Sequence, residues 1–161
     1  ENSAVVNLST GVANIDAGDA MTMANAQRSI EVAHPGRLLL RLGVRHLHLV
    51  EWVRKHDYSK PLTYMRAYLE AMHKARFMAV GPSDLPEIVL AALGPKMLEL
   101  AASETAGAHP YFVPPEHIQM ARNVMGPDAL LYPEQMVVIE SDPDAARAIA
   151  RQHMKLSLIH Y

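Results

Sequence analysis

The stretch that decides the fold reads Ile88-Val89-Leu90-Ala91-Ala92-Leu93 and is followed at once by Gly94-Pro95. Six consecutive apolar residues predict a strand of a parallel sheet, in which both faces are covered by helices. Pro95 opens the helix predicted for residues 95–103, because a proline is tolerated at the first helical position, where the N–H has no partner. This stretch therefore predicts one βα unit.

The same unit recurs on both sides of this stretch. Strands are predicted at residues 4–8, 37–44, 88–93, 108–113 and 135–140, and helices at 19–32, from Pro61 to 72, at 95–103, 115–125 and 144–156. Strands that alternate with helices form right-handed crossovers in a parallel sheet, and ligands bind at the carboxyl ends of such strands. Five βα units are therefore expected.

Two motifs that would indicate nucleotide-binding folds do not occur. There is no G-x-G-x-x-G after the first strand and no G-x-x-x-x-G-K-[ST] anywhere in the sequence. A complete (β/α)₈ barrel has eight units and roughly 250 residues, whereas this chain has 161 residues. The prediction is an α/β fold, a partial TIM barrel that forms one domain over residues 1–161, with a flavodoxin-like five-stranded sheet as the alternative.

Composition limits the class of partner. The net charge of -2, from 15 basic and 17 acidic residues, gives no field that would attract nucleic acid or an anionic membrane. No apolar run approaches the roughly 18 residues of a membrane helix, and the chain starts without a signal-peptide pattern. The absence of cysteine suits a reducing compartment. We therefore expect a cytoplasmic protein whose partner is a small-molecule substrate.

Several stretches together resemble one protein family. They are Leu90 to Ala102 followed by Ala106-Gly107-Ala108-His109-Pro110-Tyr111; Pro35-Gly36-Arg37 leading to 42–46; Lys60-Pro61-Leu62 leading to 65–69; and Pro133-Glu134-Gln135 leading to Asp142-Pro143. In this order and spacing they resemble the bacterial luciferase-like monooxygenases, in particular the actinobacterial branch that is associated with the deazaflavin coenzyme F420. The resemblance covers nearly the whole chain.

The resemblance implies a (β/α)₈ barrel of which the third to seventh strands are represented. It also implies an oxidoreductase in which the protein positions F420, or alternatively FMN, for hydride transfer with an unknown organic substrate. The rival hypothesis is a non-catalytic, truncated barrel that associates through its open edge strands. A homo-oligomer is expected in either case.

The candidate site residues lie in the predicted strands or in the segments that follow them. Gly94 can bring backbone N–H groups close to a phosphate at the start of the helix at Pro95, and Lys96 would add charge; a tight turn without a ligand is the alternative. The predicted cofactor-binding residues are Gly94, Pro95 and Lys96, to which the resemblance adds Gly43 and His109, with His46 as the catalytic residue near the ring or substrate.

Three other features at the strand ends carry less weight. His46 and His48 lack a third ligand, so no metal is predicted. Arg41 and Arg45 depart from the family pattern, in which small residues are usual, and two such cations either hold a phosphate or block the ring. Gly107 is interpreted as the glycine that ends the preceding helix.

Overall fold

The computed structural model describes residues 7–44 and 60–158 of the chain. A parallel sheet has the strand order β1-β3-β4-β5-β6, and β2 also pairs with β3. The elements in chain order are β1 (Leu8–Ser9), β2 (Ala13–Asn14), α1 (Ala20–Ala33), β3 (Leu38–Gly43), α3 (Pro61–Lys74), β4 (Ile88–Leu90), α4 (Pro95–Glu104), β5 (Gly107–Ala108), α5 (Pro115–Met125), β6 (Leu130–Leu131) and α6 (Pro143–Leu158).

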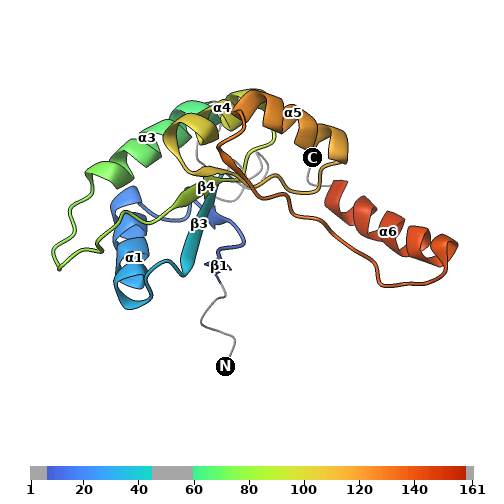
Figure 1. Cartoon of the computed structure of the whole chain (residues 1–161), viewed down its shortest axis with the longest axis horizontal. Helices are drawn as coiled ribbons and strands as arrows, with labels where there is room; N and C mark the ends of the chain where they lie inside the picture. Colours follow the sequence, from blue (N-terminus) through green and yellow to red (C-terminus); the bar gives the residue numbers. More distant parts are fainter. Residues whose placement is uncertain (1–6, 45–59, 159–161) are drawn as a thin grey trace.

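The sheet is curved, and helices α1, α3, α4 and α5 cover its convex side (Figure 1). Successive strands are neighbours and are parallel, so the chain winds in one direction only. A flavodoxin-like sheet would reverse its strand order and carry helices on both faces. The structure thus confirms the predicted partial barrel, here called the half-barrel, and excludes the flavodoxin-like alternative.

The helices begin where the sequence signals predict. The Asp19 carboxylate accepts a hydrogen bond of 2.9 Å from the backbone N–H of Thr22 and caps α1. Helices α3, α4 and α5 each start with a proline, at Pro61, Pro95 and Pro115. The observed helices agree with the predicted ones to within about two residues at each end.

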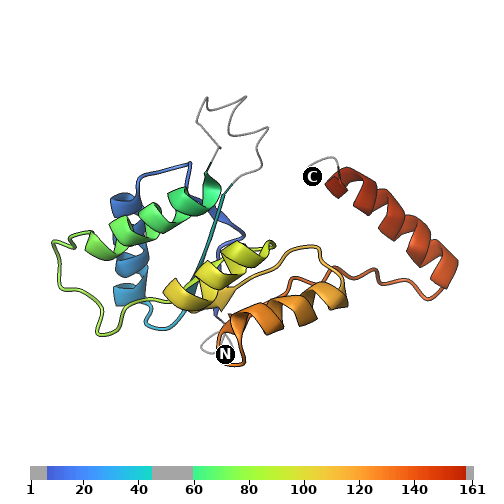
Figure 2. The same ribbon diagram turned by 90° about the horizontal axis from the view of Figure 1, so that it is seen from above.

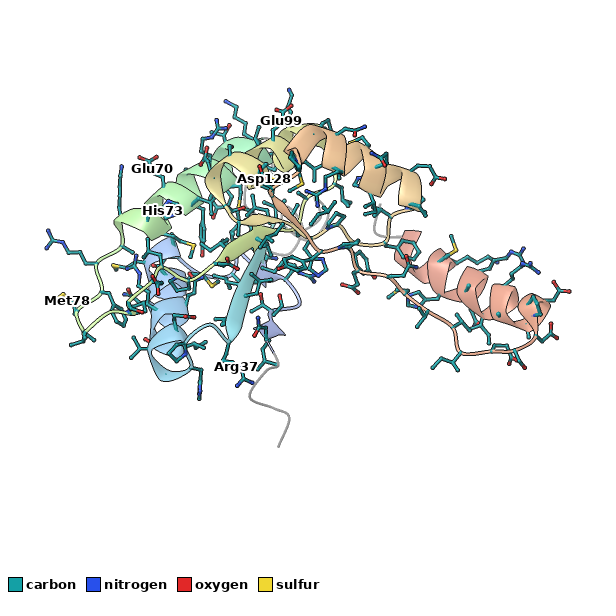
Figure 3. The ribbon with its side chains drawn as sticks, in the orientation of Figure 1. Arg37, Glu70, His73, Met78, Glu99 and Asp128 are labelled. Atoms are coloured by element: carbon teal, nitrogen blue, oxygen red, sulfur yellow. The ribbon has the colours of Figure 1, made fainter. Side chains whose placement is uncertain are left out.

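The core lies between the sheet and the helices on its convex side. Leu40 and Leu42 of β3 and Leu90 of β4 are buried there against the helices, among them Leu69 of α3 and Leu98 of α4. The outer surfaces of α3 and α4 are polar, and Figure 3 shows Glu70 and Glu99 pointing away from the sheet.

Side chains alternate between the two faces of a strand. Because Leu40 and Leu42 face the helices, Leu39, Arg41 and Gly43 belong to the concave face. This face corresponds to the interior of a complete barrel.

The first predicted strand is corrected in part. Residues 4–6 lie outside the described residues, and two short edge strands, Leu8–Ser9 and Ala13–Asn14, take the place of one. β1 pairs with the start of β3 and β2 with its end. Between them the Thr10 hydroxyl accepts a hydrogen bond from the Arg41 N–H (2.9 Å) and donates one to the Arg41 carbonyl (3.1 Å).

Three other predicted strands are wrong in length or place. β4 ends at Leu90 instead of residue 93, and β5 ends at Ala108 because Pro110 has no N–H and Phe112 turns the chain with a φ of 54°. The last strand is Leu130–Leu131, whereas residues 135–140 are exposed and form no strand. An apolar run becomes a strand only where a neighbour can pair with it.

The C-terminal helix α6 contacts the half-barrel through the rings of His153 and Phe112, whose centroids lie 6.5 Å apart. Figure 2 shows α6 away from the other helices. The linker that precedes it exposes Val137 (77%) and Ile139 (100%), and α6 exposes Ile149 and Met154. Among the described helices, none is long and apolar enough to cross a membrane.

Candidate functional site

A cluster of three polar side chains lies near the carboxyl ends of three strands. Arg41 comes from β3, His109 directly follows β5, and Glu134 follows β6. The Arg41 Nη1 atom lies 2.7 Å from Nδ1 and 2.5 Å from Nε2 of His109, and 3.5 Å from Oε2 of Glu134. The winding of the half-barrel thus joins residues up to 93 positions apart.

Arg41 is the cation of this cluster. Thr10 fixes its backbone from one side through the two hydrogen bonds described above, and β4 pairs with it from the other. The residue is only 6% exposed, and its Nε atom is buried without a hydrogen-bond partner among the described residues. A buried donor without an acceptor is costly, so this side chain has unused binding capacity.

His109 contacts this guanidinium with its ring. Its backbone N–H donates to the Leu90 carbonyl at 2.8 Å, which fixes the residue just beyond the end of β5. Burial and the charge of Arg41 lower the pKa of His109, and Glu134 opposes this shift. A guanidinium only donates hydrogen bonds, so the ring nitrogen that accepts one is unprotonated and His109 is neutral near pH 7.

Glu134 is the outermost member of the cluster. Its backbone N–H donates to the Pro110 carbonyl at 2.9 Å, and its backbone forms an isolated parallel β-bridge with Tyr111. Its side chain is 38% exposed. It also lines a cavity of about 530 Å³ between α5 and residues 131–135, whose wall includes Val113 and Ile118.

A second cavity lies at the opposite end of the strands. Its volume is about 540 Å³, and its wall includes Gly36, Leu38 and Glu87 at the amino ends of β3 and β4. Barrels and open parallel sheets bind their ligands at the carboxyl ends. The cluster end is therefore the better candidate site.

The predicted residues of the loop before α4 form an open corner. Gly94 has a φ of -79°, and a Cβ there would meet nothing within 4 Å. Gly94, Pro95 and Lys96 are all exposed. The N–H groups of Met97 and Leu98 donate to the Gly94 carbonyl, whereas the N–H of Lys96 has no backbone acceptor among the described residues.

Gly43 and His46 have different outcomes. A Cβ on Gly43 would lie 2.6 Å from Cγ1 of Val12 and 3.0 Å from Cβ of Ala91, so this glycine admits the neighbouring strand β2. His46 lies outside the described residues, as do His48 and Arg45. Their predicted roles stay predictions.

Arg41 can be recognised from the sequence, whereas Glu134 cannot. Arg41 stands out as a cation in an apolar strand, and the structure joins it to the predicted residue His109. Glu134 was not among the predicted site residues, because no local pattern distinguishes it from a loop carboxylate. The described residues contain no group of three His, Cys, Asp or Glu residues placed to hold a metal ion.

Comparison with known proteins gives a fold. An F420-dependent secondary alcohol dehydrogenase, in complex with an F420-acetone adduct, matches 91% of this chain with a TM-score of 0.73 and 13% identity. The monooxygenase RslO1 from Streptomyces bottropensis matches 96% with a TM-score of 0.69 and 17% identity. The chain has the fold of the luciferase-like oxidoreductases.

A third luciferase-like structure agrees with the first two. It is the coenzyme F420 dependent tetrahydromethanopterin reductase from Methanopyrus kandleri, which matches 87% of the chain with a TM-score of 0.64 and 14% identity. The chain spans about half of these structures, namely 54%, 57% and 52% of their lengths. No family model and no curated protein sequence matches the chain.

Proposed function

We propose that the half-barrel binds a deazaflavin, or alternatively FMN, at the carboxyl ends of its strands and serves an oxidoreductase reaction on a small organic substrate. The main support is the position of the cluster, which lies at the strand ends of a fold shared with F420-dependent enzymes. Such a cofactor, when bound, supplies the hydride chemistry.

The residues at these strand ends suit the two parts of such a cofactor. A phosphate would fit the open space beside Gly94, next to the backbone N–H and the ammonium group of Lys96. His109 lies just beyond the end of β5, where it can contact the ring of the cofactor. Gly43 shapes the neighbouring strand end, and His46 follows it in the sequence as the proposed catalytic residue.

Association with a second copy belongs to the same proposal. Four apolar side chains of the C-terminal segment are exposed to water, and a second copy could bury them: Val137, Ile139, Ile149 and Met154. We also propose the cytoplasm as its compartment, because the sequence contains no cysteine.

The test is a titration of the purified chain with F420 and, separately, with FMN, followed by fluorescence and accompanied by light scattering. Lys96→Ala should weaken binding about tenfold or more if Lys96 contacts a phosphate. Lys74→Ala is the control, because Lys74 is an exposed lysine that pairs with Glu70 on α3.

The outcomes of the titration separate the two hypotheses. Saturable binding that Lys96→Ala weakens and Lys74→Ala does not would support the proposal. Binding that Lys96→Ala leaves unchanged would overturn the phosphate role, and binding of neither cofactor would favour the non-catalytic barrel.

A further inference from the structure

The buried guanidinium of Arg41 is incompletely paired. It carries five N–H donors, yet Nη1 contacts the neutral ring of His109 and a single carboxylate oxygen, and Nε has no acceptor among the described residues. Buried arginines are normally compensated by a carboxylate that accepts two parallel hydrogen bonds. Arg41 can therefore bind a further anionic group besides Glu134.

Glu134 is a weak and displaceable partner. Its 3.5 Å contact exceeds the 2.7–3.2 Å of a good hydrogen bond, and 38% of its side chain is exposed, compared with 7% for Arg41. An exposed carboxylate loses little free energy when it turns into water. Another anion can thus replace Glu134 as the partner of Arg41.

The cavity beside Glu134 indicates what that anion carries. Five of the nine residues in its wall are apolar, namely Val113, Pro115, Ile118, Leu131 and Pro133. Its volume of about 530 Å³ lies in the range of sites for small organic molecules. Glu134 lines this cavity and also lies 3.5 Å from Arg41, so the cavity adjoins the cluster at Glu134.

We propose that Arg41 binds the carboxylate of an organic acid whose apolar body occupies this cavity, and that Glu134 turns aside to admit it. We also propose that organic acids of this kind are the substrates of the site. Only this claim about the substrate rests on the proposed function. The binding of the acid needs no cofactor, so the two proposals fail separately.

The test is calorimetric titration of the full chain, without cofactor, with benzoate, acetate and inorganic phosphate. Benzoate should bind more tightly than acetate, because its ring occupies the apolar cavity, and more tightly than phosphate. Equal affinity for benzoate and acetate, or tighter binding of phosphate, would overturn the proposal.

Substitutions of Glu134 and Arg41 should change the affinity for benzoate in opposite directions. Glu134→Gln removes the competing charge and should tighten benzoate binding about two- to fivefold, whereas Arg41→Gln should weaken it at least about tenfold. Glu140→Gln, at an exposed site outside the cluster, should change nothing. If Arg41→Gln does not fold, Glu134→Gln tests the proposal alone. Unchanged or weaker benzoate binding in Glu134→Gln would contradict the displacement of Glu134 by the acid.

Discussion

Among the glycines, Gly107 of β5 leaves the least room for a Cβ, which gives a sharp prediction for Gly107→Ala. A Cβ there would lie 1.9 Å from the Leu130 carbonyl oxygen, whereas real Cβ atoms keep at least 3.0 Å. β6 would have to move by about 1 Å. Its hydrogen bonds from Leu130 to Ala106 and from Tyr132 to Ala108, both 2.9 Å, would then break. At about 1 kcal/mol each, with about 1 kcal/mol of backbone strain, the loss is about 3 kcal/mol.

Urea unfolding followed by circular dichroism measures this loss, and amide hydrogen exchange at Leu130 and Tyr132 locates it. Gly94→Ala is the control, because its φ is -79° and its Cβ would meet nothing within 4 Å. That variant should stay within about 0.5 kcal/mol of the wild type. If Gly107→Ala were equally mild, the pairing of β5 with β6 would be wrong.

Three further predictions concern other contacts. Tyr68→Phe should cost about 1 kcal/mol of unfolding free energy, because its hydroxyl donates to the Gly18 carbonyl at 3.0 Å; burial raises the pKa of Tyr68 to about 12, so ultraviolet titration should show a late-ionising tyrosine that Tyr68→Phe removes. Arg28→Ala should cost about 1–3 kcal/mol in urea unfolding, since Arg28 donates to the Ala75 and Met72 carbonyls at the end of α3, and an unchanged midpoint would refute this cap. His109 should titrate below its ordinary pKa of about 6.5 in an NMR titration, and its contribution to stability should be present above that pH and diminish as pH falls through it; a pKa above 6.5 would contradict the contact with Arg41.

The helices could be predicted from the sequence because their signals are local. Asp19 before α1 and the prolines that open α3, α4 and α5 act within one turn of chain. Strand ends depend on distant neighbours. Residues 135–140 have an apolar strand pattern but no strand to pair with, while the short pair Leu130–Leu131 lies beside Gly107.

The glycines show the same difference. Gly107 was interpreted as the end of a helix, but α4 ends at Glu104 with Thr105 as its cap, and Gly107 lies in β5. Its small size is required by the carbonyl of Leu130, which is 23 positions away in the sequence. A contact of that kind leaves no local signal.

The site was predicted in part for a similar reason. His109 was placed at a strand end, and Arg41 stood out as a cation in an apolar strand, yet their contact depends on how β3, β4 and β5 lie side by side. Glu134 joins them only because β6 continues past Leu131 along the bridge with Tyr111. No spacing in the sequence encodes that meeting.

The central claim is that the carboxyl ends of the strands form the binding site. The most direct measurement is an NMR titration of the ¹⁵N-labelled chain with F420, followed by FMN. We predict that the amide signals of His109 and Tyr111 shift with saturation, while those of Gly36 and Glu87 at the opposite cavity do not. Shifts confined to Gly36 and Glu87 would contradict it.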